Sequence, residues 1–176
     1  AAFFRCQAKD NASGVENLGV IAAGEAYSLL TFKDKLYIAV YPQAGIFVYD
    51  PQSAFFLNSN PCLLGRISDY QDRPNAMIGM PNDKIAIGTI PGYGHLGGAI
   101  TLFDTATNNF EVFRNVIPDQ SVVALVGLPD GKIGAGSYIS GGGGSFPTQT
   151  DARFIIWDPK SKQKTVDQVI TPRAAS

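Results

Sequence analysis

The chain has 176 residues, of which 45% are hydrophobic, and a formal net charge of −1. This composition is typical of a globular protein with one sizeable core. A chain so close to neutral lacks the basic field that offsets phosphate repulsion, so we expect no nucleic-acid partner. No apolar run approaches the roughly 20 residues that cross a bilayer, so we expect no membrane association.

The N-terminal residues indicate whether the protein is secreted. It begins AAFFRCQ without a methionine, which fits either a removed leader or a piece of a longer polypeptide. The triplet Asn11-Ala12-Ser13 is a glycosylation sequon and favours a secreted protein. Cys6 and Cys62 match no metal-site spacing, so they are either unpaired thiols or the single bridge of a secreted protein.

A repeat with a period of about fifty residues follows, and such a period is typical of propellers and solenoids. Three segments of β-branched and aromatic residues end in an aspartate at a constant spacing of 54: Asp50, Asp104 and Asp158. A polar turn before a strand recurs at spacings of 49 and 48 and aligns Lys35, Lys84 and Lys132. A third element precedes each unit, as LGVI (18–21), LGRI (64–67) and RNVI (114–117).

Each unit contains four short segments rich in Val, Ile, Phe and Tyr and bounded by turn residues, which predicts four β-strands. In the first unit these are SLLTF, KLYIAV, GIFVYD and AFFLN (54–58). Repeated four-stranded antiparallel units predict an all-β fold, a β-propeller. We place its blades at about residues 16–60, 64–115 and 116–170, with residues 1–7 as the outer strand of a preceding blade.

Three blades and one strand do not close a ring, because propellers have about four to eight blades. An open set exposes unpaired sheet faces at both ends. We therefore expect the rest of the propeller to come from another chain or from a missing segment of the same polypeptide.

Loops of an up-and-down meander alternate between the two ends of a blade. One face carries short turns, whose aspartates we expect to bond their own backbone. The other face carries the long connections at 89–98 and 137–152 and the connections between blades, and long loops are more often functional. Its mixture of aromatic, acidic and amide side chains suits a carbohydrate ligand. The candidate ligand-binding residues are Tyr27, Asn75, Asp119, Gln120 and Tyr138.

The stretch GTIPGYGHLGGAI (88–100) places the only histidine, His95, among glycines. A dinucleotide-binding loop needs a helix that begins at the loop, but the strand sequence AITLFD follows, so phosphate binding is not expected. The run GGGG (141–144) indicates flexible or tightly curved backbone. A single histidine without a cysteine cluster does not predict a metal site, and we expect no cofactor. Trp157 is expected in the core.

Three segments carry a resemblance to a known group: GTIPGYGHLGGAITLFD, RNVIPDQSVVALV and GSYISGGGGSFPTQTDARFIIWDP. They resemble large secreted microbial WD40-like propellers. Among carbohydrate-active propellers, the chain is similar to the seven-bladed polysaccharide lyases that cut beside a uronic acid, including a fungal rhamnosyl-glucuronate lyase type. The resemblance covers roughly residues 16–170 and implies a secreted protein that acts on carbohydrate.

A lyase of this type needs a group that neutralises the uronate, a base and an acid. Arg73 is the candidate for the carboxylate through a bidentate contact, and His95 or Tyr93 for the proton transfers. Alternatives remain for each residue: Arg73 pairs with a neighbouring acid such as Asp72, and His95 bonds nearby backbone or stacks on Tyr93. The alternative function is a non-catalytic propeller that binds glycan or protein through the same face.

Overall fold

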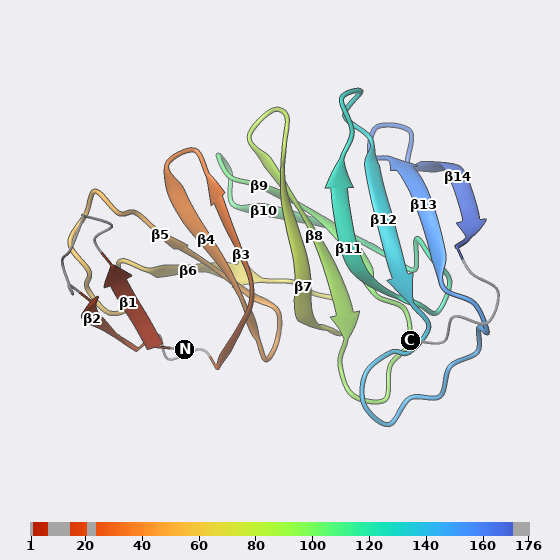
Figure 1. Ribbon diagram of the computed structural model, residues 1–176, viewed down its shortest axis with the longest axis horizontal. Helices are drawn as coiled ribbons and strands as arrows, with labels where there is room; N and C mark the ends of the chain where they lie inside the picture. Colours follow the sequence, from red (N-terminus) through yellow and green to blue (C-terminus); the bar gives the residue numbers. More distant parts are fainter. Residues whose placement is uncertain (1, 7–14, 21–23, 171–176) are drawn as a thin grey trace.

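The computed structural model describes residues 2–6, 15–20 and 24–170. These residues form three four-stranded antiparallel sheets and one two-stranded sheet (Figure 1). All fourteen elements found in this part of the chain are strands, so the predicted all-β class is confirmed. The same residues include no helix with the length and apolar character of a membrane span.

Each sheet is a simple meander of consecutive strands. The first sheet contains β3 (Glu25–Phe32), β4 (Lys35–Tyr41), β5 (Gly45–Tyr49) and β6 (Cys62–Arg66). The second contains β7 (Gln71–Met80), β8 (Lys84–Pro91), β9 (Ala99–Asp104) and β10 (Asn109–Arg114). The third contains β11 (Ser121–Gly127), β12 (Ile133–Tyr138), β13 (Arg153–Asp158) and β14 (Gln163–Val169). Separately, β1 (Ala2–Cys6) pairs with β2 (Val15–Val20).

The expected fourth strand of the first sheet, at residues 54–58, is wrong. Phe56 and Asn60 form only an isolated bridge within the β5–β6 connection, and the fourth strand is β6. The side chain of Asn60 accounts for this loop, because its amide nitrogen donates to the carbonyl oxygens of Asp50, Ser53 and Ala54 at 2.8, 3.1 and 3.2 Å. These bonds hold the backbone in a compact turn instead of a ladder.

The limits of the sheets also differ from the expected ranges. The LGRI segment, expected to precede a unit, supplies most of β6, the last strand of the first sheet. That sheet therefore covers residues 25–66, whereas the sequence suggested 16–60. The matching LGVI segment contributes to β2, which pairs only with β1 in the two-stranded sheet of the described residues.

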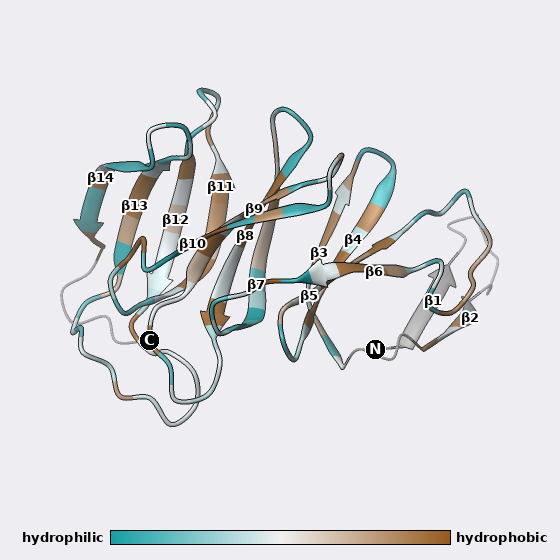
Figure 2. Cartoon of the chain, turned by 180° about the vertical axis from the view of Figure 1, so that it is seen from behind, coloured by the Kyte–Doolittle hydropathy of each residue, from teal (hydrophilic) through white to brown (hydrophobic). Residues whose placement is uncertain are grey.

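The three larger sheets pack face to face in sequence order, with β7 beside both β3 and β11. Figure 2 shows hydrophobic stretches along the strands and hydrophilic turns at their ends. Alternation on β4 shows how both faces are filled: Tyr37 and Ala39 pack toward the second sheet, and Ile38 and Val40 pack on the opposite face. Such a strand reads as a continuous apolar run in the sequence.

Trp157 lies in the core, as predicted. It is 2% exposed, and its ring lies 4.9 Å from that of Phe113 on β10. The tryptophan therefore fixes the third sheet against the second one.

The aspartates at the strand ends form turns, as predicted. One carboxylate oxygen of Asp104 accepts bonds from the amides of Ala106 and Thr107, both at 3.0 Å. These backbone bonds lower the pKa of the Asp104 carboxyl. Asp50 and Asp158 accept equivalent bonds at 2.9 and 2.8 Å.

Two sequence features were used to predict whether the protein is secreted: the cysteines and the glycosylation sequon. Cys62 carries a half-buried free thiol, which fits the unpaired alternative for this residue. The sequon at 11–13 lies outside the described residues.

Candidate functional site

The long loops and the connections between sheets meet at one face, as the meander predicts. This face is at the lower edge of Figure 1. The amide of Gly92 donates to the carbonyl of Tyr70 at 2.7 Å, and the amide of Gly98 donates to the carbonyl of Gln120 at 2.9 Å. Each bond joins the β8–β9 loop to a connection between sheets. Residues far apart in the sequence are therefore held together here.

The glycine run at 141–144 packs directly on the loop that carries His95. Gly142 donates to the carbonyl of His95, and Gly94 donates to the carbonyl of Gly143, both at 2.9 Å. A Cβ atom at Gly142 would lie 1.8 Å from the carbonyl oxygen of Gly92, so only glycine fits. This close approach gives the run a structural role, and β9 follows the loop where phosphate binding would require a helix.

A pocket of about 470 Å³ opens on this face. Tyr93 and His95, two of the predicted catalytic residues, line it together. Arg66, at the end of β6, also lines the pocket and is exposed. Arg66 is not among the residues predicted from the sequence, because LGRI was expected to precede a unit and not to form its last strand. The end of β6 places residue 66 at this face. The remaining lining residues are Gln43, Ile67, Tyr70, Gln71, Asp72 and Gly92.

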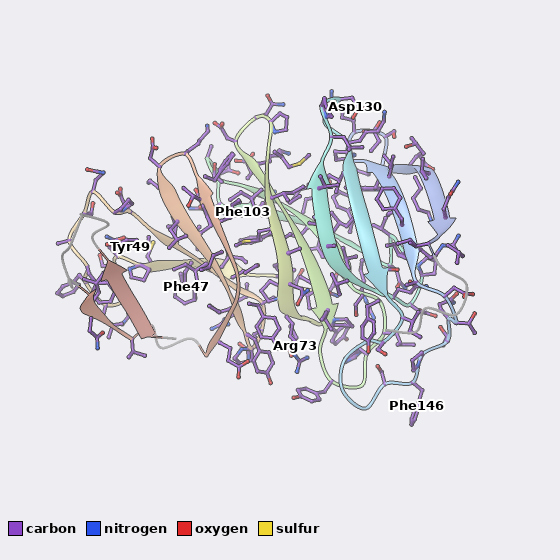
Figure 3. All side chains as sticks on the ribbon, viewed as in Figure 1. Phe47, Tyr49, Arg73, Phe103, Asp130 and Phe146 are labelled. Atoms are coloured by element: carbon purple, nitrogen blue, oxygen red, sulfur yellow. The ribbon has the colours of Figure 1, made fainter. Side chains whose placement is uncertain are left out.

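Arg73 lies on the same face (Figure 3), next in the chain to Asp72 of the pocket and in contact with three tyrosines. Its guanidinium carbon is 4.5 Å from the ring centre of Tyr41 and 5.1 Å from that of Tyr93. Its Nη1 is 3.4 Å from a carboxylate oxygen of Asp72, and Tyr27 provides a further hydrogen bond. The alternative in which Arg73 pairs with Asp72 is therefore the one observed.

The two tyrosines beside Arg73 have opposite pKa shifts. Their hydroxyl oxygens are 3.4 Å apart. The hydrogen bond with Tyr41 and the nearby charge of Arg73 lower the pKa of Tyr93. The same hydrogen bond raises the pKa of Tyr41. Tyr93 is thus the member of the pair that ionises first.

His95 stacks on Tyr70, not on Tyr93 as one alternative held. The two ring centres are 4.2 Å apart with an interplanar angle of 19°. The backbone amide of His95 donates to the carbonyl of Gly92 at 3.1 Å. Arg114 lies 5.6 Å from the Tyr70 ring centre and donates to the carbonyl of Leu96 at 2.8 Å. These contacts fix the imidazole at the edge of the pocket.

The other predicted ligand-binding residues are not among those that line this pocket in the described chain. Asn75 donates to the carbonyl of Val123 at 3.1 Å and so connects the second and third sheets. Gln120 is 1% exposed and donates to the carbonyl of Asp151 at 2.9 Å. Two more remain near the third sheet: Asp119 accepts a bond from Thr148, and Tyr138 is half-buried at the end of β12. Tyr27 belongs to the Arg73 cluster.

The described residues contain no group of side chains suited to hold a metal ion. Among residues 2–6, 15–20 and 24–170, no three His, Cys, Asp or Glu side chains come together in a way that would hold an ion. No protein-family model matches the chain, and no curated protein matches it. The function must therefore be inferred from the chemistry of the pocket.

Proposed function

We propose that the three larger sheets are consecutive blades of a secreted β-propeller. Their face-to-face order and the adjacency of their first strands support this arrangement. The far face of the third sheet carries Val126, which is 50% exposed, beside Phe154 and Gly134. A further blade, from another chain or from the rest of the polypeptide, would cover this face.

The mass of the particle in solution tests ring closure by copies of this chain. Analytical ultracentrifugation of the 176-residue chain should give an oligomer. A stable monomer of this length alone would contradict closure of the ring between chains.

We further propose that the propeller acts on carbohydrate, cleaving a uronate-containing polysaccharide by β-elimination. One observation carries this proposal: a cation, an imidazole and a tyrosine with a lowered pKa share one pocket, as Arg66, His95 and Tyr93. Arg66 pairs with the uronate carboxylate through its planar guanidinium. Neutralising that carboxylate makes the neighbouring C–H bond more acidic.

Tyr93 and His95 then carry the proton transfers. The Tyr93 phenolate takes the proton beside the carboxylate, the C–H electron pair forms the carbon–carbon double bond, and the C–O bond to the leaving sugar breaks. His95 acts as the general acid and gives a proton to the leaving oxygen. In this scheme Arg73 has a different role from the one expected from the sequence, because it stabilises the Tyr93 phenolate as a positioning residue and does not contact the uronate.

The lyase proposal is tested by the absorbance of its product, since β-elimination creates a conjugated double bond that absorbs in the near ultraviolet. Polymers that contain glucuronate or galacturonate are incubated with the wild-type chain and with Tyr93→Phe and His95→Ala. Both variants should abolish the signal. Tyr138→Phe is the matched control, because Tyr138 lies near the same loops and does not belong to the lining residues. Equal activity in all four proteins would contradict the assignment.

A non-catalytic glycan-binding propeller is the second candidate. The exposed rings on this face favour it: Tyr93 is 64% exposed and Phe146, in the β12–β13 loop, is 86% exposed. Flat aromatic faces stack on sugar rings without any need for a proton-transfer pair. Calorimetry separates the two functions, because this candidate binds the polymer, produces no near-ultraviolet signal, and keeps its affinity in His95→Ala.

A further inference from the structure

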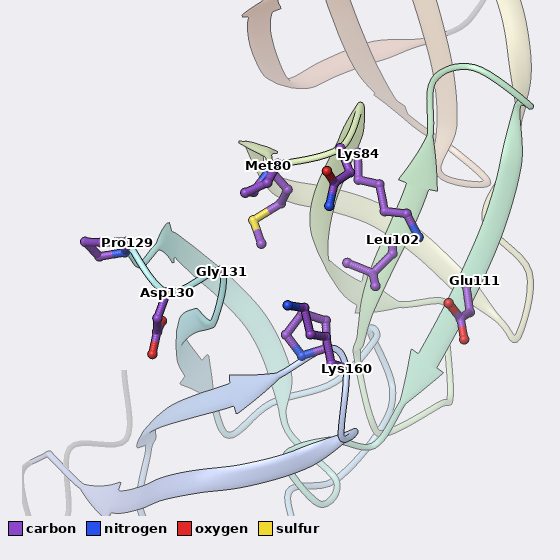
Figure 4. A pocket seen from close by; sticks show the side chains of 11 residues that line it. Met80, Lys84, Leu102, Glu111, Pro129, Asp130, Gly131 and Lys160 are labelled. Atoms are coloured by element: carbon purple, nitrogen blue, oxygen red, sulfur yellow. The ribbon is translucent and has the colours of Figure 1, made fainter.

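A second pocket opens at the opposite face, which carries the short turns between strands. It has a volume of about 310 Å³ and lies between the second and third sheets (Figure 4). Asp130, which lines it, projects at the far end of the molecule from Arg73 and Phe146. The pocket is therefore separate from the site proposed above.

The base of this pocket is apolar and preformed. Met80 at the end of β7 and Leu102 on β9 are 8% and 6% exposed and belong to the core between the sheets. Three prolines in the surrounding turns, Pro81, Pro129 and Pro159, also line it. Because proline fixes its own φ angle, these walls lose little conformational entropy when a ligand binds.

Both acidic side chains that line the pocket form ion pairs, whereas two lysines that line it do not. Glu111 is neutralised by Lys162 at 2.9 Å, and Asp130 is paired with Lys132. Lys84 and Lys160 also line the pocket, and neither forms an ion pair with any carboxylate of the described residues. The pocket thus presents two amines that belong to no salt bridge of the described residues and can contact an anion.

The two amines approach from different sheets. Lys84 is the first residue of β8 in the second sheet, and Lys160 lies in the β13–β14 turn of the third. Lys84 opposes Asp104 across the β8–β9 ladder, and that carboxylate accepts two backbone amides. Asp158, two residues before Lys160, accepts the Lys160 backbone amide at 2.8 Å. A ligand with one apolar group flanked by two negative groups would match the apolar base and both lysines.

We propose that this pocket binds a short extended peptide segment in which one apolar side chain is flanked by two acidic residues. The apolar side chain packs on Met80 and Leu102, and the two carboxylates contact Lys84 and Lys160. The volume is at the lower end of those that hold small ligands, about 300 to 1,000 Å³. No aromatic ring is among the lining residues in the described chain, so the pocket lacks the stacking surface that a sugar needs.

The test uses backbone amide NMR of the chain with a probe peptide, acetyl-Asp-Leu-Asp-amide. Binding should shift the amides of Met80, Leu102 and Gly131 and leave those of Tyr93 and His95 unchanged. Two probes remove one part of the ligand each: acetyl-Asn-Leu-Asn-amide lacks the charges, and acetyl-Asp-Gly-Asp-amide lacks the apolar side chain. Each should bind at least about fivefold more weakly than the first peptide.

Variants of the protein test the role of each lysine against a lysine outside the pocket. Lys84→Gln and Lys160→Gln should each weaken binding of the first peptide about threefold, as expected for exposed charge pairs. Lys35→Gln is the control, because Lys35 occupies the same repeat position as Lys84, at the start of β4, and does not line this pocket. It should leave the affinity unchanged.

Three results would overturn the proposal. The first is the absence of any shift at the pocket. The second is equal binding of the charged and neutral peptides, and the third is an equal loss of affinity in Lys35→Gln. None of these results bears on the glycan site, whose assays report on the other face.

Discussion

The hydroxyl oxygens of Tyr41 and Tyr93 lie 3.4 Å apart, beside a guanidinium that contacts both rings. Since the hydrogen bond stabilises one phenolate at the expense of the other hydroxyl, the two groups do not titrate alike. Arg73 adds a positive charge that favours ionisation of Tyr93. The pair is thus arranged to lower the pKa of the more exposed tyrosine.

Removing either cause should raise the pKa of Tyr93 toward its usual value. Tyr41→Phe deletes the hydrogen bond, and Arg73→Gln deletes the charge, so both shift ionisation of Tyr93 to higher pH. Ultraviolet titration of tyrosinate measures the shift, and Tyr93→Phe identifies which transition belongs to this residue. If Tyr93 is the base of a lyase, the rise of the reaction rate with pH moves upward in the same two variants. An unchanged titration curve in both would contradict the electrostatic account.

Two fully buried threonines should respond oppositely to the same substitution. The hydroxyl of Thr89 donates to the side-chain oxygen of Gln71 at 2.5 Å and accepts from the amide of Ala99 at 3.0 Å. Thr89→Val leaves both partners buried and unsatisfied, so we expect a loss of about 1–3 kcal/mol in the free energy of unfolding.

Thr101 on β9 provides the control for that prediction. Its hydroxyl is buried and has no hydrogen-bond partner among the described residues. Thr101→Val removes an unsatisfied polar group, so stability should be unchanged or higher by about 1 kcal/mol. Denaturant unfolding measures both variants, and equal losses would contradict the hydrogen-bond account.

Gly142→Ala should separate the β12–β13 loop from the β8–β9 loop. The added Cβ would overlap the carbonyl oxygen of Gly92, and the clash with backbone cannot be relieved by a side-chain rotation. Hydrogen exchange of the Gly94 amide, which donates to Gly143, should therefore become faster.

Gly144→Ala is the matched control in the same loop. Gly144 has a φ of +80°, and an added Cβ meets nothing within 4 Å. The expected cost is backbone strain of about 1 kcal/mol, with slow exchange at Gly94 retained. Equally fast exchange in the two variants would show that strain, and not the clash, controls the loop.

Phe146→Ala tests whether the exposed Phe146 ring, on the face that carries the long loops, binds sugar as proposed. At 86% exposure, the side chain contributes little to packing, so the melting temperature should not change. Loss of a stacking contact should weaken polymer binding roughly three- to tenfold. Calorimetry with polymers and with short fragments measures the effect, and unchanged affinity for all of them would remove Phe146 from the binding surface.

Several features of the fold could be predicted because their causes are local. A carboxylate two or three residues from backbone amides forms a turn wherever it occurs, so Asp50, Asp104 and Asp158 marked strand ends correctly. The site could be predicted only in part. Tyr93 and His95 lie on a loop whose position follows from the meander. Arg66 was not predicted, because the fourth strand of the first sheet was expected at residues 54–58, whereas it is β6, which ends at Arg66.

The sequence by itself determined the β class, the period of the repeat and the face that carries the long loops, because turn chemistry and apolar segments act over a few residues. Only the tertiary structure decided which side chains meet. Tyr41 and Tyr93 are 52 positions apart, and Gln120, predicted at the surface, is 1% exposed and donates to the carbonyl of Asp151. Side-chain direction at these positions depends on how neighbouring sheets pack, and that packing is a property of the assembled fold.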